Sequence, residues 1–141
     1  MLLNIHGQNI ETESIESKCA ITVGILQGGG SLVGADFEAL LTQRVSLHIG
    51  AGFIGFGGGI NYHLKPSIRS SMLSVAYWHQ GVGETYTQSA IGPSFVFRAR
   101  KIFSAQLGIG YLIETGPGID KINYEPPPVL LLYSIGVYFP L

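Results

Sequence analysis

Hydrophobic and polar residues alternate along most of this chain, in short runs separated by Gly, Pro or charged clusters. In the clearest run, 45–53, large or apolar residues at every second position alternate with Ser46, His48 and two glycines. A period of two places one class of side chain on each face of a β-strand. Seven further runs repeat the pattern, with weaker alternation in the first, fourth and fifth of them: 19–27, 31–41, 54–64, 69–80, 85–98, 101–113 and 129–141. Because helix signals are nearly absent, we expect an all-β protein.

About eight strands joined mostly by short turns predict an up-and-down antiparallel β-barrel over residues 18–141. Pro93 is expected to mark a bulge or kink in its strand, since proline cannot donate to the ladder. Residues 1–17 are polar and show neither strand nor helix periodicity, so we interpret them as a flexible polar leader. The length of 141 residues fits one barrel domain after that leader.

The composition of the two strand faces indicates which face points inward. Charged residues make up 12% of the chain and hydrophobic residues 46%. One face of each run is broad and apolar, whereas the other holds Gly, Ser, Gln, Asn and His. A soluble ligand-carrying barrel would show the reverse, with a charged exterior and an apolar interior. We therefore expect a transmembrane barrel whose apolar faces meet lipid. A soluble lipocalin-like barrel that binds a hydrophobic ligand stays open as the alternative.

The inward faces are expected to form a polar network that fills the lumen. Its predicted members come from five of the runs: Asp36, Glu38, His48, His63, Arg98 and Gln106. Asp36 and Glu38 share one strand face, and Arg98 lies at a similar depth on another strand. Because a buried charge must be paired or hydrated, we expect a salt-bridge plug rather than an open pore.

Charge divides the turns between the two rims of the predicted barrel. Six of the eight Lys and Arg residues lie near Arg44, 65–69 and 98–101, the turns on one rim. The other rim is glycine-rich or acidic and includes the long stretch 115–127. Short inner turns and longer outer loops are typical of outer-membrane barrels with both termini in the periplasm. The stretch 115–127 is then the best place for a protein partner.

The last strand carries a pattern that resembles the terminal signal read by the outer-membrane assembly machinery. Ser134, Gly136, Phe139 and Leu141 occupy its polar, glycine and hydrophobic positions, with Leu141 where an aromatic residue is usual. Together with the eight strands, residues 18–141 resemble a small bacterial outer-membrane barrel of the OmpA/OmpX type. The resemblance implies a Gram-negative outer-membrane location, the lipid bilayer and the assembly machinery as partners, a structural role and no catalytic residues. Met1-Leu2-Leu3 does not form an intact signal peptide, so the export signal is expected to have been removed.

Candidate catalytic and cofactor motifs are weak. Gly50 to Gly55 fits the letters of a dinucleotide-binding loop, but a glycine run follows where a helix should start, which speaks against it. Some outer-membrane lipid A deacylases use a His and a Ser two residues later on one strand face. No His here has that partner, and Ser46 precedes His48 at the reversed offset. We expect no enzyme, cofactor or metal, with a lipid-modifying membrane enzyme as a further alternative.

The net charge and the single cysteine exclude some classes of partner and bound group. A net charge of −1 gives no basic footprint for nucleic acid, so none is expected as a partner. The single Cys19 excludes an intramolecular disulfide and a multi-cysteine metal site. His48 and His63 fall on the inward faces of neighbouring strands, where we expect a hydrogen-bonded packing role; a cross-strand functional pair is the alternative. Six aromatic residues are expected in the interfacial belts of a membrane barrel: Tyr62, Tyr77, Trp78, Tyr111, Tyr133 and Tyr138.

Overall fold

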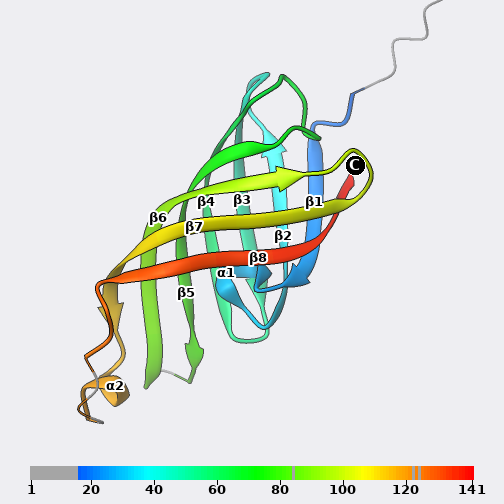
Figure 1. Ribbon diagram of the computed structural model, residues 1–141. Coiled ribbons are helices and arrows are strands. Elements are labelled where there is room, and N and C mark those ends of the chain that lie inside the picture. The colour runs from blue at the N-terminus through cyan, green and yellow to red at the C-terminus, as the bar shows by residue number, and fades with distance from the viewer. Residues whose placement is uncertain (1–15, 84, 122, 124) are drawn as a thin grey trace, which may run out of the picture.

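The computed structural model of the chain is a closed barrel of eight antiparallel strands in sequence order (Figure 1). It describes residues 16–83, 85–121, 123 and 125–141; most of the predicted leader lies outside them. The strands are β1 (Cys19–Ile25), β2 (Val33–Leu40), β3 (Val45–Gly52), β4 (Gly55–His63), β5 (Met72–Val82), β6 (Tyr86–Arg98), β7 (Phe103–Thr115) and β8 (Val129–Pro140). Each strand pairs with the next, and β8 pairs with β1. The predicted all-β, up-and-down barrel is confirmed.

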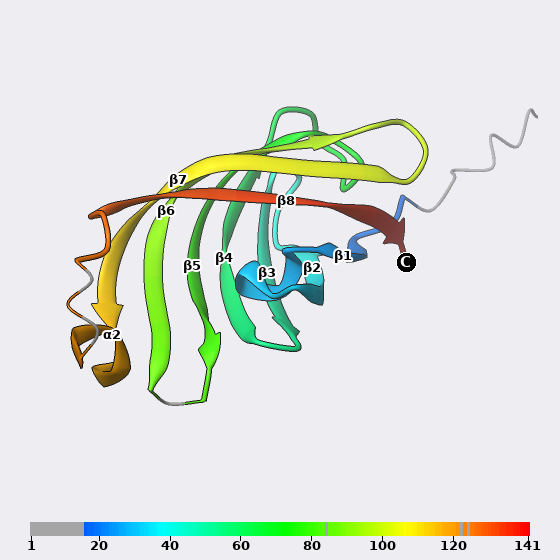
Figure 2. The same ribbon diagram turned by 60° about the horizontal axis from the view of Figure 1, so that its bottom comes forward.

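The barrel is uneven in height. Strands β1 to β4 have 7 to 9 residues, whereas β5 to β8 have 11 to 13. The long strands extend past the short ones at the end that carries α2 (Pro117–Lys121), as Figures 1 and 2 show. The start of β1 and the end of β8 lie together at the opposite end, here called the terminal end.

The two faces of the wall follow the alternation of the sequence. On β3, Ile49 points outward and is 68% exposed, whereas Ser46 points inward and is buried. On β7, Leu107 is 60% exposed and Ser104 is buried. Outward positions of β1 to β6 and β8 carry no Asp, Glu, Lys or Arg among the described residues. The barrel therefore has an apolar outer face, and its interior combines buried polar side chains with an apolar cluster of Ala76, Trp78 and Leu132.

A glycine-rich segment folds back into the lumen between β1 and β2. This segment, α1 (Gln27–Gly30), contacts β2 to β5 and β8 and is buried (Figure 2). Gly28 and Gly29 have φ angles of 65° and 78°, which L side chains rarely adopt. A Cβ on Gly29 would lie 2.0 Å from the carbonyl oxygen of Phe56. The sequence predicted that these glycines form a turn on the glycine-rich rim. Their backbone instead folds inward and fills the end of the lumen opposite the terminal end.

Two of the expected belt aromatics point the other way. Trp78 and Tyr138 face the lumen and are 7% and 0% exposed, so their assignment to the interfacial belts was wrong. Trp78 lies at an inward position of β5, and the hydroxyl of Tyr138 donates to the carbonyl of Ala99 at 2.7 Å. Tyr62, Tyr111 and Tyr133 do face outward and are exposed, as the alternation of β4, β7 and β8 predicts.

Pro93 interrupts the ladder without shifting it. It pairs with Val75 of β5, but β6 and β7 have no paired residues at Gly92 and Pro93. The register shift between β6 and β7 lies instead at Ser89 and Ala90. The predicted irregularity is therefore a gap at Pro93 and a bulge four residues earlier.

Candidate functional site

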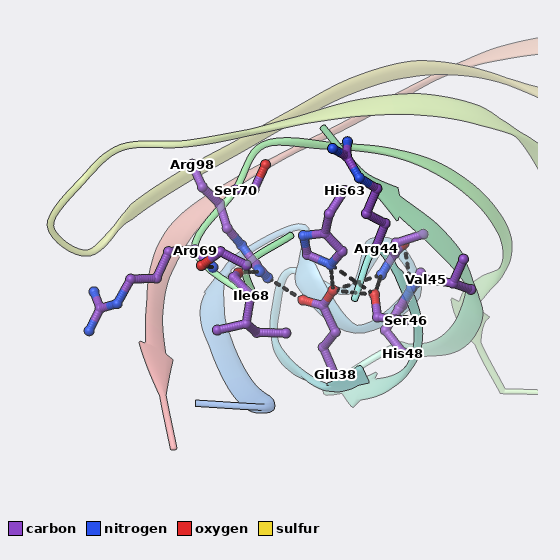
Figure 3. Close-up of polar contacts among 12 residues, drawn as sticks. Glu38, Arg44, Val45, Ser46, His48, His63, Ile68, Arg69, Ser70 and Arg98 are labelled. Carbon is purple, nitrogen blue, oxygen red and sulfur yellow. Dashed lines mark hydrogen bonds and ion pairs between the residues drawn. The ribbon is translucent and has the colours of Figure 1, made fainter. Parts of the chain in front are cut away.

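The carboxylate of Glu38 is the centre of a buried polar cluster at the terminal end of the lumen (Figure 3). Its Oε2 accepts a hydrogen bond from Arg98 Nη2 at 2.5 Å, which forms an ion pair. Its Oε1 lies 2.8 Å from His63 Nε2 and accepts from Ser46 Oγ at 2.5 Å and from Asn61 Nδ2 at 3.2 Å. Glu38 is 2% exposed, so these partners replace water around the charge.

Strand register brings the cluster together. Ser46 of β3 is opposite Asn61 of β4, and Glu38 of β2 is opposite His48 of β3, so their side chains share the inward face. Arg98 reaches Glu38 from β6, across the lumen. Its Nη1 also donates to the carbonyl of Ile68, which is fully buried in the connection between β4 and β5. This connection therefore covers the opening of the lumen at the terminal end.

The other predicted network residues lie around this centre or apart from it. His48 Nδ1 lies 3.0 Å from Asn61 Oδ1, so the two histidines join through Asn61 and Ser46 rather than to each other. Asp36 Oδ2 accepts a hydrogen bond from the backbone N–H of Gly28 at 3.1 Å and so ties β2 to the folded-back glycine segment.

Gln106 belongs to a second cluster in the lumen, which lies farther from the terminal end than the Glu38 cluster. Its Nε2 donates to Ser94 Oγ at 2.6 Å, and its Oε1 accepts from Ser134 Oγ at 3.2 Å. Gln27 of α1 donates to the same Ser134 hydroxyl at 2.9 Å. Ser134 and Gly136, two residues of the predicted assembly signal, thus face the lumen, whereas Phe139 faces outward and Leu141 follows β8.

Sequence reasoning left five members of these clusters out of the predicted network: Ser46, Asn61, Ser94, Ser134 and Gln27. Ser46 and Asn61 lie at inward positions of their alternating runs, so the period of two could have found them. Gln27 carried no such signal, because it lies in a segment whose inward fold depends on glycine φ angles. Its contact with Ser134 spans 107 positions of sequence.

The Glu38 cluster contains a serine, a histidine and a carboxylate, but their geometry does not form a proton relay. A relay needs one ring nitrogen of the histidine on the serine and the other on the carboxylate. Here His63 Nε2 faces both Ser46 Oγ, at 3.0 Å, and Glu38, while His63 Nδ1 is buried without a hydrogen-bond partner. The cluster is therefore arranged to hold charges, not to activate a nucleophile.

Space beside the cluster is also too small for a substrate. The cavity lined by Asp36, Glu38, Ser74 and Arg98 has a volume of about 30 Å³. A single water needs roughly 10–15 Å³ measured this way, so the cavity fits about two or three waters. No group of three or more His, Cys, Asp or Glu among the described residues is arranged to hold a metal ion.

Comparison with protein-family models, with curated proteins and with solved structures finds no match to this chain. Within the described part of the chain, no helix is long and apolar enough to cross a membrane.

Proposed function

We propose that this chain is an outer-membrane β-barrel of a Gram-negative bacterium, with a lumen closed by side chains and backbone. It acts as a structural protein or through its outer loops, and it does not form an open pore. One observation carries the proposal: the outward face is apolar around the barrel, while the charges lie inside as a paired cluster. Soluble monomers rarely expose a continuous apolar surface of this extent.

The two ends of the lumen support the closed-pore part of the proposal. The glycine segment α1 fills one end, and Ile68 with the Glu38–Arg98 pair closes the other. A soluble lipocalin-like barrel, the second candidate, would need an apolar cavity of ligand size in the lumen. The cavities of about 30 and 100 Å³ in the lumen are both smaller than a ligand pocket of this kind, which favours the membrane barrel over it.

Charge at the rims suggests an orientation. Arg44, Lys65, Arg69, Arg100 and Lys101 all lie in connections at the terminal end. With both termini in the periplasm, this rim faces the periplasm, and the opposite rim, which carries α2 within the stretch 115–127, faces the cell exterior. That stretch is the proposed contact for a protein partner, and Ser134, Gly136, Phe139 and Leu141 are the proposed signal for the assembly machinery.

The test is solubility without detergent, followed by gel mobility of the detergent-folded chain with and without boiling. A membrane barrel needs detergent and migrates differently after boiling. A monodisperse β-protein in detergent-free buffer that binds a fluorescent fatty acid would instead support the soluble ligand-binding barrel.

A further inference from the structure

An apolar groove on the outer face of the barrel lies next to a basic pocket at the terminal end. The groove has a volume of about 910 Å³, and its walls include outward side chains of β4, β5, β6 and β7. The pocket has a volume of about 590 Å³ and lies between the β4–β5 connection and the end of β6. Three exposed cations line the pocket: Lys65, Arg69 and Arg100.

The groove and the pocket occupy successive rows of outward side chains on the same part of the wall. Tyr62, Leu73 and Phe95 are partners across β4, β5 and β6, and all three line the groove. Leu64 and Phe97, which follow Tyr62 and Phe95 by two residues, line the pocket. Two residues along a strand span about 7 Å. The two depressions therefore form one surface, which is apolar toward the middle of the barrel and basic at the terminal end.

The exposed cations of the pocket have no counter-charge on the part of the chain that the structure describes. Arg98 also borders the pocket, but its charge is paired with Glu38 in the lumen. Among the described residues, Lys65, Arg69 and Arg100 form no ion pair, and no Asp or Glu lines the pocket. Figure 3 shows the side chain of Arg69 pointing away from Glu38. The pocket therefore presents three uncompensated positive charges where the apolar wall ends.

Hydrogen bonds hold the connection that carries two of these cations in place. The backbone N–H of Lys65 donates to Ser70 Oγ at 2.9 Å, and that of Arg69 donates to Ser67 Oγ at 3.2 Å. The carbonyl of Ile68, between them, accepts from the Arg98 guanidinium. The backbone that positions Lys65 and Arg69 is therefore ordered before any ligand binds, which lowers the entropy cost of binding.

We propose that this surface binds a phospholipid with a net-anionic headgroup; this inference rests on the proposed membrane location. The phosphodiester lies among Lys65, Arg69 and Arg100, which donate charge-assisted hydrogen bonds to its oxygens. The acyl chains pass over Leu64 and Phe97 and enter the groove. Basic side chains at the membrane surface attract anionic headgroups, and the apolar wall beside them faces the hydrocarbon.

The two parts of the surface have different roles in selecting the lipid. In a bilayer any acyl chain can fill the groove, so the groove determines where the lipid lies and the charges determine which headgroup is bound. A zwitterionic headgroup also carries an ammonium group, and no carboxylate among the described residues lines the pocket to receive it. Free phosphate would meet the same cations but would leave Leu64 and Phe97, 47% and 48% exposed, uncovered.

The experiment uses the full chain folded in a non-ionic detergent, with its heat-dependent gel shift recorded first. Phosphatidylglycerol and phosphatidylcholine with identical acyl chains are titrated separately, and native mass spectrometry gives the ratio of their apparent dissociation constants. A phosphatidylglycerol with a photoreactive group in its acyl chain then labels the wall, and peptide mapping locates the label. We expect tighter binding of phosphatidylglycerol and labelling at groove residues such as Phe95 and Leu107.

Two double variants separate the pocket from the overall charge of the rim. Lys65→Gln with Arg69→Gln removes two charges from the pocket and should lower the preference for phosphatidylglycerol by roughly 25-fold, about fivefold for each cation. Lys18→Gln with Lys101→Gln is the matched control, because it removes two exposed charges at the terminal end that do not line the pocket. The control should keep the wild-type preference. All four side chains are exposed, so both variants should keep the heat-dependent shift.

Failure of the lipid site and failure of the membrane location give different results. A chain that shows the heat-dependent shift but binds both lipids equally would overturn the lipid site while the membrane barrel stands. Equal losses of preference in the two double variants, or photolabelling confined to β1 and β2, would overturn it as well. Complete displacement of phosphatidylglycerol by inorganic phosphate would show a simple anion site instead. A chain that is soluble without detergent would overturn the proposed location and the lipid site together.

Discussion

Replacing Arg98 with Met should destabilise the barrel strongly, because Glu38 would remain as a buried carboxylate without its counter-charge. Arg98 makes the ion pair with Glu38 and also donates to the carbonyl of Ile68. Its guanidinium lies 4.8 Å from the ring centroid of Tyr138. Breaking a buried ion pair by removing one partner costs about 3–5 kcal/mol. We expect a decrease in the unfolding free energy within that range.

Glu38→Gln should destabilise by a similar amount, since Arg98 would then be the uncompensated charge. Glu38→Gln combined with Arg98→Met removes both charges and keeps an acceptor for Ser46. The loss in this double variant should be smaller than the sum of the single losses by about 2–3 kcal/mol, the upper range for coupled neighbours. Arg69→Gln is the control. Figure 3 shows Arg69 pointing away from Glu38, and its side chain is exposed, so we expect a change within about 0.5 kcal/mol.

The assay is denaturant unfolding of the detergent- or vesicle-folded chain, followed by tryptophan fluorescence and by gel mobility without boiling. The chain has one tryptophan, Trp78, and it lies in the lumen, so its emission reports opening of the barrel. If each single variant lowered the unfolding free energy by less than 1 kcal/mol, the salt-bridge plug would be refuted. Fully additive losses in the double variant would also do so, because they would show that Glu38 and Arg98 do not interact.

Three further predictions test separate parts of the structure. Gly29→Ala should prevent or severely impair folding, because its Cβ would lie 2.0 Å from a backbone oxygen. Gly83 has a similar φ of 67° but open space around it, so in denaturant unfolding Gly83→Ala should lower the unfolding free energy by only about 1–2 kcal/mol. Trp78 emission should be quenched only weakly by a brominated detergent, and strong quenching would show that the indole faces outward. Phe139→Ala should lower the folded fraction in cell envelopes without changing refolding into detergent. Phe95→Ala, at another outward phenylalanine, should lower neither quantity. Equal losses of folded protein in cell envelopes for the two variants would count against the assembly signal.

The strands could be predicted because each one carries its own period of two. The predicted run 45–53 became β3 (Val45–Gly52), and the run 54–64 became β4 (Gly55–His63). The same period predicted that Glu38 faces inward. Trp78 was misassigned because its run alternates only weakly, so its side was inferred from the usual position of aromatic residues at the membrane interfaces of barrels. Its position between outward Tyr77 and His79 already indicated an inward side chain.

Contacts between distant strands could not be predicted in the same way. The ion pair between Glu38 and Arg98 was inferred from depth alone, whereas the roles of Asn61 and Ser46 depend on the register that makes them neighbours. The inward fold of Gln27–Gly30 depends on left-handed backbone at successive glycines and on matching glycines in β3 and β4. A single sequence shows the glycines but not which backbone lies against them.

The distribution of open space bears on where any chemistry of this barrel can occur. The lumen offers about 30 Å³ beside the buried charges and about 100 Å³ beside Trp78, while the groove on the outer face offers about 910 Å³. Substrates need space more than they need polar groups, so the larger number of polar residues inside does not make the lumen the better site. On this reasoning the role of the lumenal cluster is to stabilise the wall of the barrel.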